Sequence, residues 1–202
     1  MSKPAELSRR LDVRLALRVL FACALVVLSS RSSSAQSDIV PVHVQAELFA
    51  KLANYDRNFA KRAGPKARVL IVQVPRNAES SLFASAMSSA LGRIDRIAGL
   101  PLAVAVVTYT GAAALAKACQ GENVAAVYLG PGLDGEMARV RAALTGVNVI
   151  SVAARREYVP LGAVLGFELA SGKPRVLVNL PQARKQDVDF RADVLKLMRV
   201  YR

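Results

Sequence analysis

Residues that could carry out catalysis are few and scattered in this sequence. His43 is the only histidine, so a metal cluster of histidines cannot form. As a general base His43 would need a nucleophile within reach, and the sequence places none. Ser80-Ser81 and Ser88-Ser89 lie in an expected helix and lack the glycine-flanked turn that exposes a nucleophilic serine. The sequence therefore predicts a protein that is not an enzyme, with His43 as a solvated or capping residue and no metal site.

Residues 130–135 fit the pattern G-x-G-x-x-G between an expected strand and an expected helix. In a dinucleotide site such glycines let a pyrophosphate approach the backbone at a helix N-terminus. Here Pro131 removes one backbone N–H, and residues 151–154 (Ser-Val-Ala-Ala) stand where an acidic residue should bind the ribose. We therefore expect no cofactor and a structural turn with Asp134 near the helix cap, although such a loop could also hold a small anion.

The first 35 residues have the features of a cleaved secretory signal peptide. Five basic residues precede a run of ten apolar residues, 19–28, and small residues at 33–35 provide a cleavage site after Ala35. Ten apolar residues are too few for a permanent membrane span, which takes roughly 20. We expect export to the periplasm, by the general or the twin-arginine route, and a single mature domain over residues 36–202.

Charge and cysteine content limit the partners of the mature chain. Of 28 basic and 15 acidic residues, 22 and 13 follow Ala35, so the net charge is +9. This surplus favours an acidic partner: a membrane face, a cell-wall polymer or an acidic protein. Nucleic acid is not expected, because the chain is exported and only 5% of its residues are aromatic. Cys119 is an unpaired thiol once the signal leaves with Cys23, and it is either buried at a helix end or available for an intermolecular disulfide.

Hydrophobic periodicity predicts how these residues are positioned. Apolar and amphipathic runs alternate along the chain, which is typical of a parallel sheet with helices on both faces. The C-terminal part of the chain departs from this alternation. There, two period-2 runs joined by Ser171-Gly172-Lys173-Pro174 predict an antiparallel hairpin. The expected fold is a three-layer α/β domain with a mostly parallel sheet of about six strands and a C-terminal hairpin at its edge. Expected helices span 44–59, 79–98, 111–119, 136–144, a segment from Pro181 and 194–201, and expected strands span 68–74, 102–109, 124–129, 147–152, 163–169 and 175–180.

The last forty residues also carry a specific pattern of spaced residues. The pattern consists of Gly162, Leu165-Gly166-Phe167, Gly172, Arg175, Val178-Asn179-Leu180, Ala183-Arg184, Leu195-Lys196-Leu197 and Arg199-Val200. In this order and spacing they resemble the end of the YfiR-type periplasmic regulator family, although Val176, residues 187–188 and Met198 depart from that pattern. The resemblance implies structural roles for Gly162, Gly166, Phe167, Asn179, Leu180, Arg184, Leu195, Leu197 and Arg199.

The resemblance also implies a function. The family restrains an inner-membrane diguanylate cyclase by binding the periplasmic part of that enzyme, and so controls cyclic di-GMP signalling. A homodimer is compatible with the resemblance. The alternative is a periplasmic small-ligand-binding module that serves a transporter or sensor, with a pocket at the carboxyl ends of the strands.

Two segments are candidate interfaces for such a partner. Tyr55 and Arg57 lie in the first expected helix, and tyrosine and arginine are common anchors of protein contacts. The other interpretation is that Tyr55 and Phe59 pack on the sheet while Asp56 and Arg57 point to water.

The second candidate segment follows the expected strand 147–152. Arg155, Arg156 and Tyr158 stand there in a region expected to be an exposed loop. Loops on a rigid scaffold often carry recognition residues.

Overall fold

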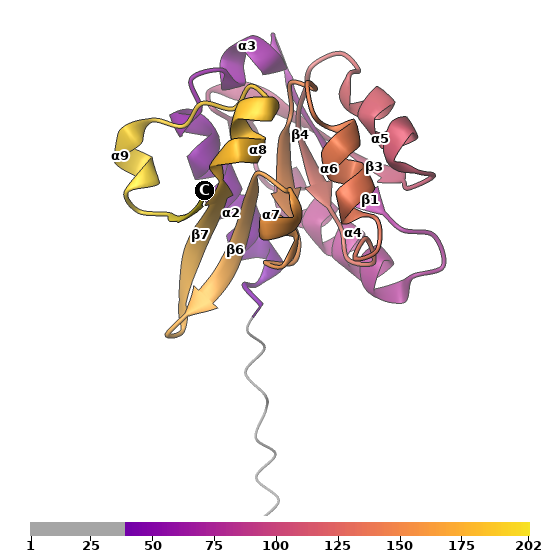
Figure 1. The fold of residues 1–202 in the computed structure, drawn as a ribbon. Helices are drawn as coiled ribbons and strands as arrows, with labels where there is room; N and C mark the ends of the chain where they lie inside the picture. The colour runs from indigo at the N-terminus through magenta and orange to yellow at the C-terminus, as the bar shows by residue number, and fades with distance from the viewer. Residues whose placement is uncertain (1–38) are drawn as a thin grey trace, which may run out of the picture. The chain divides into compact units, whose positions relative to one another are not determined.

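The computed structural model describes residues 39–202, so the expected signal peptide lies outside the described residues. A single sheet runs through them in the order β2-β3-β1-β4-β5-β6-β7-β8 (Figure 1). The strands from β3 to β6 in this order are parallel. Strand β2 is antiparallel to β3, and β7 is antiparallel to β6 but parallel to β8. The α/β fold with a mostly parallel sheet is confirmed, but with eight strands instead of about six. The strands are β1 Ala67–Gln73, β2 Arg96–Ile97, β3 Leu100–Thr108, β4 Val124–Leu129, β5 Ile150–Ala153, β6 Leu165–Ala170, β7 Lys173–Asn179 and β8 Arg199–Tyr201.

Helices cover both faces of the sheet, and each face has its own cluster of buried apolar side chains. The central strand β4 is buried along its whole length because Tyr128 faces one cluster and Val127 the other. On the first face Phe49 packs edge-on against Tyr128, with ring centroids 5.5 Å apart. The helices on the first face are α2 Val42–Leu52, α3 Phe59–Ala63, α4 Ala78–Gly92, α8 Leu180–Lys185 and α9 Ala192–Leu195, and those on the second are α5 Ala112–Cys119, α6 Met137–Ala143 and α7 Tyr158–Leu161.

The continuous helix predicted over residues 44–59 is wrong. Helix α2 ends at Leu52, a 3-10 turn η1 (Ala53–Tyr55) follows, and Asp56 has an extended backbone before α3 begins. One carboxylate oxygen of Asp56 accepts the N–H of Asn58 and the N–H of Asp189. A local turn and a tertiary contact therefore replace the helical hydrogen bonds that the apolar spacing had predicted.

The helix predicted over residues 79–98 is also shorter in the structure. It ends at Gly92, and Ile97 lies in β2, where it pairs with Leu100. Leu82, in the first half of α4, is 73% exposed. Val106 on strand β3 is also exposed, and beyond Pro101 this strand has no neighbour on its outer side among the described strands. These differences all fall at one edge of the sheet.

The predicted hairpin is present as β6 and β7, with Leu165 opposite Val178 and Phe167 opposite Val176. These side chains share one face as expected, whereas Ala163 packs in the cluster on the other face. The helix predicted over residues 194–201 is wrong, because α9 ends at Leu195 and β8 then pairs with β7 in parallel. The hairpin is therefore not the edge of the sheet, which β8 forms instead.

Candidate functional site

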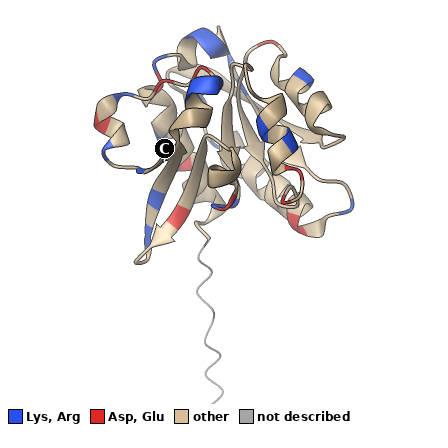
Figure 2. Ribbon diagram, viewed as in Figure 1, with Lys and Arg blue, Asp and Glu red and all other residues tan. Residues whose placement is uncertain are grey.

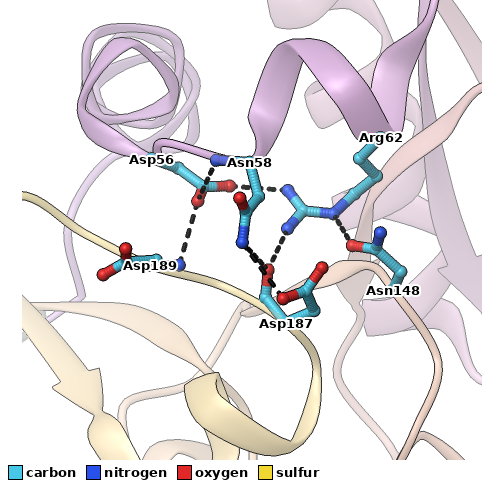
Figure 3. Close-up of polar contacts among 6 residues, drawn as sticks. All are labelled: Asp56, Asn58, Arg62, Asn148, Asp187 and Asp189. Atoms are coloured by element: carbon cyan, nitrogen blue, oxygen red, sulfur yellow. Dashed lines mark hydrogen bonds and ion pairs between the residues drawn. The ribbon is translucent and has the colours of Figure 1, made fainter.

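A buried ion pair fixes the chain where helix α2 gives way to α3 (Figure 3). Arg62 Nη1 lies 2.6 Å from Asp56 Oδ2, and the two side chains are 2% and 0% exposed. The guanidinium also donates to Asn148 Oδ1 at 2.6 Å and to the carbonyl of Asp187 at 2.9 Å. The second Asp56 oxygen accepts two backbone N–H groups, one of them from Asp189. Both charges are therefore hydrogen-bonded throughout, which a buried pair requires.

This clamp aligns two segments that are far apart in the sequence. The Arg57 N–H donates to the Asp189 carbonyl at 2.9 Å, and the Arg191 N–H donates to the Tyr55 carbonyl at 2.9 Å. Arg57 and Asp189 are 132 positions apart. The backbone pairing places the side chains of both segments on one exposed surface.

We call this surface the Tyr55 patch, and we define it as Tyr55, Arg57, Asp189, Arg191 and Asp193. Arg57 Nη1 lies 3.1 Å from Asp189 Oδ2, and both side chains are more than half exposed. The guanidinium of Arg191 lies 5.4 Å from the Tyr55 ring centroid and pairs with Asp193 at 2.7 Å. An aromatic ring with arginines already held in place is suited to contact another protein. Sequence reasoning selected Tyr55 and Arg57 but missed Asp189 and Arg191, for which no local signal exists.

The second candidate segment lies at the carboxyl ends of the parallel strands, which we call the carboxyl edge of the sheet. Helix α3 leads into the amino end of β1, whereas Arg155 and Arg156 follow the carboxyl end of the parallel strand β5. The structure therefore does not bring the two candidate segments together. Arg155 Nη2 is bound by both carboxylate oxygens of Glu79, at 2.8 and 2.7 Å, and this contact raises the pKa of Arg155.

Tyr158 is buried, so its expected exposure is wrong. Its hydroxyl donates to Asp134 Oδ2 at 3.1 Å and accepts the N–H of Leu133 at 3.1 Å. Burial raises the pKa of Tyr158 to about 12. Tyr158 thus holds the turn after β4 in place and offers no side-chain surface to a partner.

Two of the three glycines of residues 130–135, Gly130 and Gly132, are explained by packing of the chain against itself. A Cβ at Gly130 would lie 2.3 Å from the carbonyl oxygen of Val72, and one at Gly132 would lie 2.5 Å from Asn77 Nδ2. Gly132 also has a φ of 91°, which other residues rarely adopt. Both glycines are needed where the turns after β1 and β4 meet, and neither requires a bound nucleotide.

A pocket of about 220 Å³ opens at this carboxyl edge. It is small for a ligand site, since such sites usually measure roughly 300–1,000 Å³. The arginines on its wall could bind an anionic group, and its apolar residues could contact the rest of a small molecule. The pocket is lined by Ile39, Ala154, Arg155, Arg156, Glu157 and Phe167.

The remaining chemically distinctive residues are placed as follows. Cys119 is buried at the end of α5, as one of the two expectations had it, and burial raises the pKa of the thiol to about 12. His43 is exposed on α2. Within residues 39–202 no three His, Cys, Asp or Glu side chains are grouped as metal ligands. In the same part of the chain no helix has the length and apolar character of a membrane span.

Three residues of the C-terminal pattern have tight local environments. A Cβ at Gly162 would lie 2.4 Å from Arg141 Cγ, and one at Gly166 would lie 2.4 Å from Val159 Cγ2. Asn179 caps α8 by accepting the N–H of Gln182 at 3.0 Å, and its amide donates to the Val159 carbonyl at 2.8 Å. These contacts join α6, α7 and α8 to the strands.

The other pattern residues differ in burial. Phe167 belongs to the core, and Leu180 and Leu195 pack against the core while partly buried. Arg199 pairs with a buried carboxylate on β6. Three pattern residues are exposed: Arg184, Leu197 and Arg199 itself.

Several solved structures share this fold at low sequence identity. A conserved domain protein from Vibrio cholerae gives a TM-score of 0.57 at 15% identity, covering 82% of this chain and 62% of that one. A substrate-binding protein with adhesive properties from Clostridium difficile, in its ligand-free open form, gives 0.54 at 14%, covering 82% and 61%. An ABC domain from Streptococcus pneumoniae in complex with L-Trp gives 0.52 at 11%, covering 74% and 62%. This chain thus spans about three fifths of each structure.

The family assignment comes from the sequence itself. No curated protein sequence matches the chain significantly. Residues 43–199 match the family described as YfiR/HmsC-like, which spans the described fold from helix α2 to strand β8. The chain belongs to the YfiR/HmsC-like family.

Proposed function

We propose that this protein is a non-enzymatic periplasmic regulator that binds the periplasmic part of an inner-membrane diguanylate cyclase and restrains it. The observation that carries the proposal is the family match over residues 43–199. The Tyr55 patch supports it, because it offers exposed arginines and a tyrosine ring on a rigid support.

Restraint of a membrane enzyme by contact requires only that the regulator prefer one of the enzyme's two states. If the regulator binds the inactive state a hundredfold more tightly, the free-energy difference between the two states shifts by about 2.7 kcal/mol. No bond is made or broken in this protein, so its essential property is a surface that keeps its shape. The Asp56–Arg62 clamp directly beneath the Tyr55 patch supplies that rigidity.

We place the docking surface at the Tyr55 patch and not at the carboxyl edge. Arg57 and Arg191 are more than half exposed, and Arg191 stacks on Tyr55. At the carboxyl edge, by contrast, Arg155 is bound to Glu79 on α4, and Tyr158 is buried.

Co-purification with the detergent-solubilised cyclase tests the proposal. The double variant Arg57→Glu/Arg191→Glu reverses two charges of the patch, and we expect it to lose association and to fail to lower cyclic di-GMP in a deletion strain. Arg93→Glu is the control, since Arg93 is also exposed but lies at the end of α4. No association of the wild-type protein, together with unchanged cyclic di-GMP on deletion of its gene, would refute the proposal.

A small-ligand-binding module is the second candidate function. It is favoured by the pocket of about 220 Å³ at the carboxyl edge and by the likeness to a substrate-binding fold. Native mass spectrometry of the purified protein distinguishes the two. A binding module retains a small molecule that is lost in Arg155→Gln, and deletion of its gene leaves cyclic di-GMP unchanged.

A further inference from the structure

A second pocket, of about 320 Å³, lies where α6, α7, α8 and β8 meet. It shares no residue with the pocket at the carboxyl edge or with the Tyr55 patch. Figure 2 shows lysine and arginine on both α6 and α8, the two helices that flank it. The pocket is lined by Arg141, Pro160, Asn179, Pro181, Gln182, Lys185, Tyr201 and Arg202.

Three basic side chains line the pocket. Arg141, Lys185 and Arg202 come from three different segments, and no aspartate or glutamate side chain lines the pocket. Among the described residues none forms an ion pair with these three, whereas the arginines of the Tyr55 patch each pair with a carboxylate. Like charges gathered in one pocket repel one another, so an anion placed between them is favourable.

Arg141 is also held in position. A Cβ at Gly162 would lie 2.4, 2.5 and 2.6 Å from Arg141 Cγ, Cδ and Cβ, so the arginine stem passes directly over the bare backbone of this glycine. The amide of Gln182 donates to the carbonyl of Arg141 at 3.4 Å. A stem that is already ordered loses less conformational entropy when its guanidinium binds a ligand.

The groups left available in the pocket are donors. The amides of Asn179 and Gln182 already donate to backbone carbonyls. Arg141, Lys185, Tyr201 and Arg202 supply the other side-chain donors among the lining residues. Such a set matches an oxyanion with several acceptor oxygens, and arginine binds phosphate through two parallel hydrogen bonds.

We propose that this pocket binds a phosphate group, carried either by a small soluble phosphate compound or by an anionic lipid headgroup. Arg141 would grip two phosphate oxygens, and Lys185 and Arg202 would balance the remaining charge. The proposal does not depend on a cyclase partner, and its test uses the purified protein alone.

Calorimetry with pyrophosphate at an ionic strength of about 0.15 M provides the test, because the Debye length is then only about 8 Å. We expect Arg141→Gln and Lys185→Gln each to weaken binding at least tenfold, because each removes a direct contact. Arg184→Gln is the matched control: it removes the same charge from the same helix, but Arg184 does not line the pocket. We expect this control to weaken binding less than threefold, since Arg184 makes no direct contact with a ligand in the pocket and salt screens its charge.

Vesicle sedimentation identifies the source of the phosphate. If the ligand is a headgroup, the protein binds phosphatidylglycerol vesicles but not phosphatidylcholine vesicles, and Arg141→Gln abolishes that binding. If the ligand is soluble, pyrophosphate binds and vesicles do not. Absence of both kinds of binding, or an equal loss in Arg184→Gln and Arg141→Gln, would overturn the proposal.

Discussion

At the scale of single residues, the Asp56–Arg62 pair illustrates how burial changes the energetic role of an ion pair. Its side chains are 0% and 2% exposed, whereas those of the neighbouring Arg57–Asp189 pair are 60% and 52% exposed. An exposed pair contributes about 0–1 kcal/mol, but removing one partner of a buried pair leaves an uncompensated charge.

We therefore predict that Arg62→Met lowers the free energy of unfolding by about 3–5 kcal/mol, because Asp56 stays buried without its partner. Arg57→Met, which removes the exposed pair, should cost less than about 1 kcal/mol. Urea denaturation of both variants measures the difference. Equal losses in the two would show that the clamp does not hold the two segments together.

Because Cys119 is buried, we predict that the free energy of unfolding falls at high pH. Burial raises the pKa of its thiol from about 9 to about 12 in the folded protein. The buried thiol's contribution to the free energy of unfolding is fully present below pH 9. It is lost as the pH rises from about 9 to about 12, with a slope of up to about 1.4 kcal/mol per pH unit.

The measurement is the unfolding free energy of the wild type and of Cys119→Ala between pH 8 and about pH 10. Within this pH range Tyr158, whose pKa is raised from 10.0 to about 12, contributes little to the change in unfolding free energy. We expect the wild type to lose stability with pH more steeply than the variant. Parallel curves, or rapid labelling of the native thiol at pH 8, would contradict a buried Cys119.

At the scale of the elements, Gly166 determines how closely α7 approaches β6. A Cβ at this position would lie 2.4 Å from Val159 Cγ2. We predict that Gly166→Ala destabilises the protein by about 1–3 kcal/mol through overpacking, and that adding Val159→Ala restores part of that loss.

Gly92→Ala is the control, because no atom lies within 4 Å of a Cβ there and the residue ends helix α4. We expect it to be neutral or to stabilise the protein by up to about 1 kcal/mol. Thermal unfolding of the four proteins measures both effects. A Gly166→Ala variant as stable as the wild type would show that α7 can shift freely.

The sequence predicted elements well where burial alone decides the structure. Strand β4 was predicted at its observed bounds, because both of its faces are covered and its apolar run is continuous. Helix predictions failed where contacts with distant parts of the chain determine the backbone conformation. The break at Asp56 depends on Asp189, and residues 199–201 are extended because they pair with β7. Neither partner can be inferred from local spacing.

At the scale of the whole molecule, only two of the five residues of the Tyr55 patch could be found from the sequence. The residue types of Tyr55 and Arg57 suggested an interface, but Asp189 and Arg191 join them only because the C-terminal segment crosses the end of α2. Tyr158 was misjudged for the same reason, since its burial depends on the turn after β4. The family could be recognised because it depends on spacing along the chain, which folding does not change.

The two pockets and the Tyr55 patch divide the molecule into separate surfaces. None of the residues that line one belongs to another. A regulator with separate surfaces can hold its partner while a small molecule occupies a different site, and coupling between them then requires a change in affinity. We predict that pyrophosphate binding is unaffected by Arg57→Glu/Arg191→Glu, which calorimetry on that variant checks.

The central claim is that this protein restrains a membrane diguanylate cyclase through the Tyr55 patch. The most direct measurement is the rate of cyclic di-GMP synthesis by the reconstituted cyclase as the purified protein is added to its periplasmic side. We predict a saturable fall in the rate, and a titration shifted at least tenfold to higher concentration for Arg57→Glu/Arg191→Glu. A rate that stays constant at every concentration of the wild-type protein would contradict the account.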